Sequence, residues 1–263
     1  MKAPFPRDLT DALGVVRSRL GIFAADRTWH EQASSTNDLA AARAQDGAPE
    51  GLVVAAGAQT SGRGRLGRHW ASPPGAGVYA SVVLRPPPNI VSLVTIAAGV
   101  AIAEGIAAAT GFTPGLKWPN DVYAGPRKLA GILAEAGGAD AGAPYVVVGF
   151  GINVTSASYP LDVATRATSL ETEVGRPCDR GRVFAECLAA LANRYESLRD
   201  GGAPAVTTVW RTLAGGFLGR DVRWDDDGTT RRGVAEDIDP SGALVVRTDR
   251  GLVTVFSGEV CWE

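Results

Sequence analysis

The feature that most constrains this chain is a glycine- and arginine-rich stretch at residues 62–70. It reads Gly-Arg-Gly-Arg-Leu-Gly-Arg-His-Trp, with three glycines, three arginines and few apolar side chains. Glycines at this density raise the entropic cost of ordering the backbone, so the stretch predicts a mobile loop. Backbone N–H groups and guanidinium groups together bind anions. We therefore expect a lid that closes on a charged ligand and is largely disordered without it.

Two phosphate-binding motifs match this stretch only in part. The spacing of Gly62, Gly64 and Gly67 is that of the dinucleotide fingerprint, which needs a helix to begin at its last glycine. Pro73 and Pro74 follow instead, so no helix is expected there. The stretch also approaches a P-loop but lacks the Lys-Ser/Thr pair that holds phosphate and magnesium. If the stretch is considered by itself, the alternative to a ligand-binding lid is a solvated surface loop that binds nothing.

Composition limits the class of protein. With 263 residues, 45% of them hydrophobic, the chain can bury one large core and a second, small one. A net charge of -2 and a pI near 5.8 argue against a general nucleic-acid binder. The cysteines Cys178, Cys187 and Cys261 form no C-x-x-C pair, which favours reduced thiols over a disulfide framework or a zinc site.

The sequence shows neither a signal peptide nor a clear membrane span. The N-terminus lacks an apolar signal core. Residues 93–109 are apolar but rich in alanine and glycine and include Glu104, which predicts a packed helix of a soluble protein. We expect a cytoplasmic protein with no membrane partner.

Four further motifs accompany the loop along the chain. They are Ser35-Thr36-Asn37, Lys-Trp-Pro-Asn-Asp-Val-Tyr at 117–123, Lys-Leu-Ala-Gly-Ile-Leu-Ala-Glu at 128–135, and Gly-Phe-Gly-Ile-Asn-Val at 149–154. In this order, the five motifs closely resemble those of the biotin protein ligases, from about Ser35 to the C-terminus. The resemblance implies an α+β fold: a class II synthetase-like catalytic domain with a mixed sheet flanked by helices, followed by a small SH3-like β-barrel.

Local patterns agree with this organisation. Serine or threonine before an alanine-rich run predicts a helix that begins near Ser35. Strands are expected at 52–58, 78–84, 128–136 and 145–150, and helices at 93–109 and 180–199. Glycines near 201 and 215 bracket a short helix, and strands at 220–224, 233–238, 244–247 and 252–256 then predict a small barrel. We therefore divide the chain into a short N-terminal segment (1–32), a catalytic domain (33–214) and an SH3-like domain (215–263).

The N-terminal segment bears on regulation. Leu9, Leu13, Val16 and Leu20 have the spacing of one short amphipathic helix. Bifunctional members of the family carry a winged helix-turn-helix before the Ser-Thr-Asn motif, and only 34 residues precede Ser35 here. We expect no specific binding to DNA.

The resemblance implies a two-step reaction. Biotin protein ligases join biotin to ATP, giving biotinoyl-5'-AMP and pyrophosphate, and then transfer biotin to a lysine of a biotin carboxyl carrier protein of a biotin-dependent carboxylase. Two anions must meet in the first step, so positioned cations are the central requirement. By resemblance, the catalytic residues are Arg65, Lys128 and Lys117.

The resemblance also assigns the ligand contacts. Biotin would be held by Ser35, Thr36, Asn37, Gln59, Arg63, Gly64, Arg65, Lys128, Gly131 and Leu133. ATP would be held by Arg63, Arg65, Arg68, Trp70, Lys117 and Asn153. Asp121, helped by Asn120, is the expected Mg²⁺ ligand, because magnesium prefers carboxylate and other oxygen ligands beside phosphates. His69 has no assigned role.

Two other functions are considered. A lipoate or octanoate ligase shares the catalytic fold, but the Gly-Arg-Gly-Arg loop together with a small C-terminal domain favours biotin. A nucleic-acid-binding module could use the arginine loop and the barrel, and it would show steep salt dependence and release no pyrophosphate. A homodimer is possible on this sequence.

Overall fold

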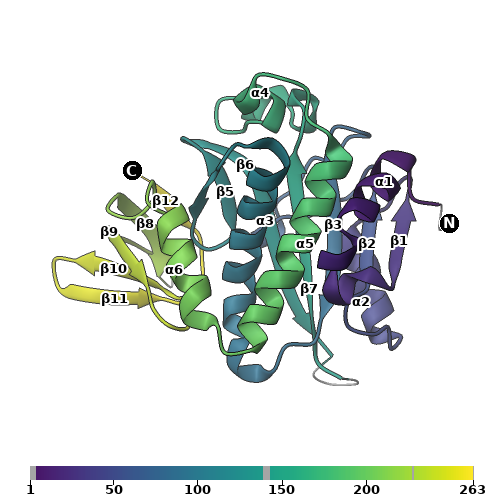
Figure 1. The fold of residues 1–263 in the computed structure, drawn as a ribbon. Helices are drawn as coiled ribbons and strands as arrows, with labels where there is room; N and C mark the ends of the chain where they lie inside the picture. The colour runs from purple at the N-terminus through teal and green to yellow at the C-terminus, as the bar shows by residue number, and fades with distance from the viewer. Residues whose placement is uncertain (1–3, 139–142, 227, 263) are drawn as a thin grey trace.

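The computed structural model describes residues 4–138, 143–226 and 228–262, and its larger part is built on a seven-stranded sheet (Figure 1). The strand order is β1-β2-β3-β7-β6-β5-β4, with β1 parallel to β2 and every other pair antiparallel. The strands are β1 (Arg27–His30), β2 (Val53–Ala56), β3 (Gly77–Leu84), β4 (Gly115–Lys117), β5 (Asp121–Ala124), β6 (Arg127–Gly137) and β7 (Tyr145–Asn153). The predicted mixed sheet flanked by helices is confirmed.

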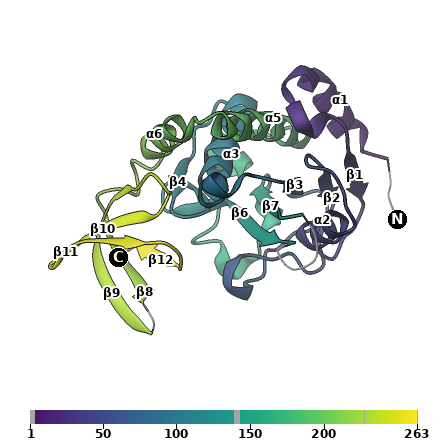
Figure 2. The same ribbon diagram turned by 90° about the horizontal axis from the view of Figure 1, so that it is seen from below.

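Helices cover both faces of this sheet (Figures 1 and 2). One face carries α1 (Arg7–Val15), α3 (Val94–Thr110) and α5 (Arg180–Arg199), and α6 (Ala203–Leu213) extends this layer; the opposite face carries α2 (Thr36–Gln45). Side chains alternate accordingly, because Val53 and Ala55 join the core below α3 and α5, whereas Leu52 and Val54 join the core below α2. Strands β2 and β3 are therefore buried on both faces, whereas β4, β5 and β6 are partly exposed.

Shorter helices connect these elements. They are α4 (Leu170–Val174) and the 3₁₀ turns η1 (Arg17–Arg19), η2 (Gly21–Ala24), η3 (Arg65–Gly67), η4 (Pro88–Leu93), η5 (Ser156–Ser158) and η6 (Leu161–Val163).

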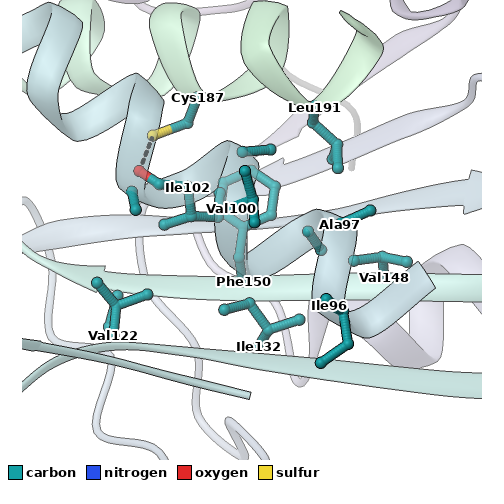
Figure 3. Close-up of a cluster of buried hydrophobic side chains, with 14 of the residues drawn as sticks. Ile96, Ala97, Val100, Ile102, Val122, Ile132, Val148, Phe150, Cys187 and Leu191 are labelled. Carbon is teal, nitrogen blue, oxygen red and sulfur yellow. Dashed lines mark hydrogen bonds between the residues drawn. The ribbon is translucent and has the colours of Figure 1, made fainter. Parts of the chain in front are cut away.

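Helices α3 and α5 pack closely against each other in the core (Figure 3). A Cβ on Gly105 would lie 2.4 Å from the Cα of Cys187, so only glycine permits the two helices to approach this closely. The segment Pro88–Thr110 has the length and hydropathy of a membrane span, but 72% of its most apolar window is buried inside the protein. The predicted packed helix is confirmed.

The C-terminal part is a five-stranded antiparallel sheet with the order β11-β10-β9-β8-β12 (Figure 2). Its strands are β8 (Asp221–Asp226), β9 (Thr229–Ile238), β10 (Leu244–Thr248), β11 (Gly251–Val255) and β12 (Val260–Trp262). The four predicted strands are present, and β12 is additional.

Specific contacts join the small sheet to the large domain. The buried Trp118 donates from Nε1 to the carbonyl of Gly242 at 2.9 Å. Arg211 on α6 pairs with Asp237 at 2.6 Å and donates to the carbonyl of Ile238 at 2.9 Å. These contacts attach β9 and the β9–β10 turn to the large domain. Strand β12 lies beside β5, because Trp262 contacts the ring of Tyr123.

Candidate active site

One cavity of about 670 Å³ brings together every residue that the sequence analysis assigned to ligands or catalysis. The loop at 62–70, α2, the β4–β5 turn and strands β6 and β7 all line it, and the C-terminal domain adds Glu259 and Val260. The assigned residues in its wall are Ser35, Thr36, Asn37, Gln59, Arg63, Gly64, Arg65, Arg68, Trp70, Lys117, Asn120, Asp121, Lys128, Gly131, Leu133 and Asn153.

The floor of the cavity is bare backbone. Gly131 on β6 lies opposite Gly151 on β7, and the Trp70 indole rests against both. A Cβ on Gly151 would lie 2.3 Å from Nε1 of Trp70. That Nε1 is buried and has no hydrogen-bond partner among the described residues. The Nζ of Lys128 lies 5.4 Å from the indole centroid, within cation–π range.

One end of the cavity is a preorganised polar wall. Ser35 caps α2, because its Oγ accepts from the backbone N–H of Asp38 at 3.4 Å. Thr36 donates from its backbone N and from Oγ1 to Oε1 of Gln59, at 2.8 and 3.1 Å. Gln59 in turn donates from Nε2 to Ser72 at 2.9 Å. The amide of Gln59 is therefore fixed in orientation before any ligand arrives.

The predicted ligand contact Asn37 is largely committed to the protein itself. It is buried; its Oδ1 accepts from Ser81 at 2.6 Å, and its Nδ2 donates to Glu135 at 2.8 Å and to the carbonyl of Leu133 at 3.3 Å. Its side chain supports the wall through these bonds. Ser81, which is fully buried, is a supporting residue that the sequence did not reveal.

Asn153 is committed in the same way. Its side chain is only 3% exposed, and its Nδ2 donates to the carbonyl of Thr168 at 2.9 Å. Its amide oxygen is the atom left to face a ligand.

The lid is closed over the cavity, and its outer arginines hold carboxylates of the protein. Arg63 contacts Asp38 at 2.6 Å and Glu135 at 2.9 Å. Arg68 contacts Glu259 of the C-terminal domain at 2.5 Å, a bond that raises the pKa of Arg68. Carboxylates of the protein itself thus occupy the positions beside the lid arginines at which we expected the anionic groups of a ligand. That the lid orders on ligand binding stays a prediction.

Two deeper cations differ from these arginines. Arg65 donates to Oδ1 of Asn120 at 3.2 Å and to the carbonyl of Gly258 at 3.1 Å, and burial lowers the pKa of Arg65. Burial also lowers the pKa of Lys117, against the opposing effect of Asp121. Neither cation forms an ion pair with any residue in the described part of the chain. The cavity therefore contains positive charge that an anionic ligand would neutralise.

Asp121 and Lys128 form a third arrangement. The Nζ of Lys128 lies 2.5 Å from Oδ1 of Asp121, and the carboxylate side chain is only 17% exposed. Asn120 beside it donates from Nδ2 to the carbonyl of Ile132 at 2.6 Å, which turns its Oδ1 toward Arg65. A carboxylate and an amide oxygen at one place form a donor set that suits Mg²⁺ beside phosphates.

Comparison with known proteins agrees with this geometry. Residues 29–153 match the biotin/lipoate A/B protein ligase family, and residues 217–261 match the biotin protein ligase C terminal domain. The bifunctional ligase/repressor BirA of Bacillus subtilis is 34% identical over 236 residues, which cover 88% of this chain and 72% of that protein. The chain belongs to the biotin protein ligase family.

Other members of the family are similar over most of their length. The biotin--[acetyl-CoA-carboxylase] ligase of Mycobacterium tuberculosis is 38% identical over 238 residues, which cover 87% of this chain and 86% of that enzyme. The structure of the biotin protein ligase from Aquifex aeolicus in complex with biotin and ATP has a TM-score of 0.78 and 27% identity, and covers 91% of this chain and 99% of that one. The resemblance drawn from the five motifs is confirmed.

Proposed function

We propose that this biotin protein ligase joins the carboxylate of biotin to the α-phosphate of ATP and then transfers biotin to a lysine of a biotin carboxyl carrier protein. The observation that carries the proposal is the pair of half-buried cations without an ion-pair partner among the described residues, Arg65 and Lys117, in the same cavity as the fixed amide of Gln59. A ligand with a neutral polar ring at one end and an anion at the other fits this arrangement. The family names the pair of substrates that has this chemistry.

The polar wall suits the ureido ring of biotin. That ring offers one carbonyl acceptor and two N–H donors, and Ser35, Thr36 and Gln59 supply hydroxyl and amide groups to match them. Asn37 holds the wall in place, and Gly131 and Leu133 border the ring. The Trp70 indole lies directly against Gly131 and Gly151 and lines the cavity, so it can stack on a flat group. We therefore assign adenine to the Trp70 side of the cavity, with the oxygen of Asn153 near its edge.

In the first step, an oxygen of the biotin carboxylate attacks the α-phosphorus and pyrophosphate leaves. Negative charge concentrates where the two anions meet, so fixed cations lower the barrier. Arg65 and Lys128 are assigned to the carboxylate and the α-phosphate, and Lys117 with Arg68 to the remaining phosphates. No side chain needs to form a covalent bond.

In the second step, the neutral amine of the carrier lysine attacks the acyl carbon of biotinoyl-5'-AMP. The bond from that carbon to the phosphate oxygen breaks, AMP leaves with the electron pair, and the amine nitrogen loses a proton. A closed lid keeps water from the mixed anhydride until the lysine arrives.

Mg²⁺ fits the oxygen donors of Asp121 and Asn120. Bound there with ATP, it would neutralise phosphate charge. We place the enzyme in the cytoplasm, in keeping with its proposed substrates.

Biotin-dependent ATP–pyrophosphate exchange by the purified protein tests the proposal. We expect exchange with biotin, none with lipoate or octanoate, and labelling of an isolated carrier domain on its lysine. Exchange that prefers lipoate would assign the alternative ligase activity. A protein without exchange that binds oligonucleotides with steep salt dependence would refute the ligase assignment.

A further inference from the structure

The side chain of Lys117 lies beside two aromatic rings from different domains. Lys117 ends the edge strand β4, opposite Asp121 on β5. Its Nζ lies 5.5 Å from the ring centroid of Tyr123 and 5.4 Å from that of Trp262. Tyr123 belongs to the catalytic sheet, whereas Trp262 belongs to β12 of the C-terminal sheet. The ammonium group thus lies within cation–π range of both rings.

The two rings are in contact with each other. Their centroids are 5.0 Å apart at an interplanar angle of 39°. Phe217 stacks on Trp262 at 6.4 Å, and the guanidinium carbon of Arg220 lies 4.7 Å from its ring. The Nε1 of Trp262 is buried and has no hydrogen-bond partner among the described residues. Ring contacts, and not a hydrogen bond within that part of the chain, therefore hold the indole in place.

Trp262 lies behind Lys117 and not in the cavity. Lys117 and Tyr123 both line the cavity wall, and Trp262 does not. Among the described residues, the ammonium has no carboxylate within ion-pair distance that could fix its position. A long lysine side chain has considerable rotational freedom, so an aromatic surface that attracts the ammonium restricts it to one region.

We propose that Trp262 is a positioning residue: the C-terminal domain, through its indole, holds the protonated Lys117 toward the phosphates of ATP. This rests on the proposed function, because it takes ATP as the ligand near Lys117. The small domain then contributes to nucleotide binding without its tryptophan touching the nucleotide. Burial of the ammonium lowers the pKa of Lys117. The negative faces of the two rings attract the protonated form of the side chain.

The test compares two replacements of the same ring. Trp262→Phe keeps an aromatic face, and Trp262→Leu keeps apolar bulk without one. We expect Trp262→Leu to raise the KM for ATP about threefold to tenfold in the exchange assay, and Trp262→Phe to stay within about twofold of wild type. The KM for biotin should not change, because the hydrogen bonds that fix Thr36 and Gln59 involve neither Lys117 nor Trp262.

A double-mutant cycle separates positioning from general loosening of the domain. In a Lys117→Gln background, Trp262→Leu should add no further increase in the KM for ATP, because the group that it positions is gone. Phe256→Leu is the matched control: it removes an aromatic ring of the same domain that is 76% exposed, and it should behave as wild type. Thermal unfolding checks that each variant is folded.

Direct ATP binding keeps this inference distinct from the proposed function. Equilibrium dialysis with ATP should show the same order of affinities, wild type and Trp262→Phe above Trp262→Leu. Wild-type protein that binds ATP but lacks exchange would contradict the proposed function. The order of ATP affinities among the wild type and the two variants would still test the role of Trp262. Equal affinities of the Phe and Leu variants, or an undiminished effect of Trp262→Leu in the Lys117→Gln background, would overturn the positioning role.

Discussion

The cavity has two sets of cations that differ in their neighbours: the outer cations Arg63 and Arg68, and the inner cations Arg65 and Lys117. Arg63 and Arg68 lie on the outside of the lid, with side chains 41% and 65% exposed; Arg63 pairs with two carboxylates and Arg68 with one. Arg65, two residues from Arg63, is more buried and donates only to an amide oxygen and a backbone carbonyl. Lys117 has aromatic rings as neighbours. The difference follows burial and not position in the sequence.

Because of this difference, we expect the outer and the inner cations to have different roles. An exposed ion pair contributes about 0–1 kcal/mol, enough to bias a loop toward one position. A buried cation without a counter-ion has lost hydration that a bound anion restores in part. In the free protein, the outer arginines therefore favour the closed lid, whereas the inner cations favour the ligand. Arg68 reaches the phosphates of ATP only in exchange for its contact with Glu259. Arg63, which the resemblance placed among the ligand contacts, pairs with Asp38 and Glu135 in this structure, and its contact with a ligand stays a prediction.

The largest expected effect contrasts two arginines of the same loop. Arg65→Ala should lower the rate of biotin adenylation by roughly 10²–10³-fold, the range for removing one preorganised donor from a site of charge development. Arg63→Ala should lower it by less than about tenfold, because it removes an exposed, paired charge. Pyrophosphate exchange measures both. Similar losses in the two variants would refute the division into outer and inner cations.

Lys128 combines features of both sets of cations, because it lines the cavity and also forms an ion pair with Asp121. Lys128→Ala should cost roughly 10²–10³-fold in adenylation, and also about 1 kcal/mol of unfolding free energy, since it leaves the Asp121 carboxylate without its partner. Adding Asp121→Asn should restore stability and not activity. Denaturant unfolding and exchange, measured on both variants, separate the two effects. If Lys128→Ala alone had the unfolding free energy of the wild type, the ion pair would not contribute to stability.

A smaller effect concerns pH and Lys117. Because burial lowers the pKa of Lys117 below its ordinary 10.5, the ammonium loses its proton at a lower pH than an exposed lysine does. The protonated form binds phosphate, so the KM for ATP should rise as pH increases through the lowered pKa, beginning below 10.5. Lys117→Gln should have a high KM that lacks this rise. Identical pH profiles for variant and wild type would exclude Lys117 from ATP binding.

The residues that sequence could predict are those whose chemistry is local. The Ser35 cap, the apolar stripe of α5 and the glycine-rich loop each follow from a few neighbouring residues, and their predicted places agree with the structure. The resemblance to a family then brought distant motifs to one site, which periodicity alone cannot do. All of the assigned residues line the same cavity.

The contacts that sequence missed join residues far apart in the chain. Ser81 supports Asn37 from β3, and Glu259 reaches Arg68 from the C-terminal domain. Both are ordinary strand or turn residues, without a local signal. The strands β1, β4, β5 and β12 have only three or four residues each, so their sequence patterns were too short to detect. Pairing of β1 with β2 also shows that the large sheet begins before residue 33, the predicted start of the domain.

The smallest expected effect tests how firmly the outer arginines close the lid. Trypsin needs a free, extended arginine, and Arg63, Arg65 and Arg68 offer three such sites if the lid opens. Without ligand, we expect the first cleavage within residues 63–68, and addition of biotin and ATP should suppress it strongly.

High salt screens exposed ion pairs, so about 0.5 M NaCl should speed this cleavage a few-fold in the free protein. Glu259→Gln should speed it at low salt, mainly after Arg68, because this variant removes the carboxylate that Arg68 holds. If neither salt nor Glu259→Gln changes the rate while ligand still protects, packing of the loop and not its outer ion pairs closes the lid. If cleavage begins elsewhere and this loop resists in every condition, the loop is not a ligand-gated lid.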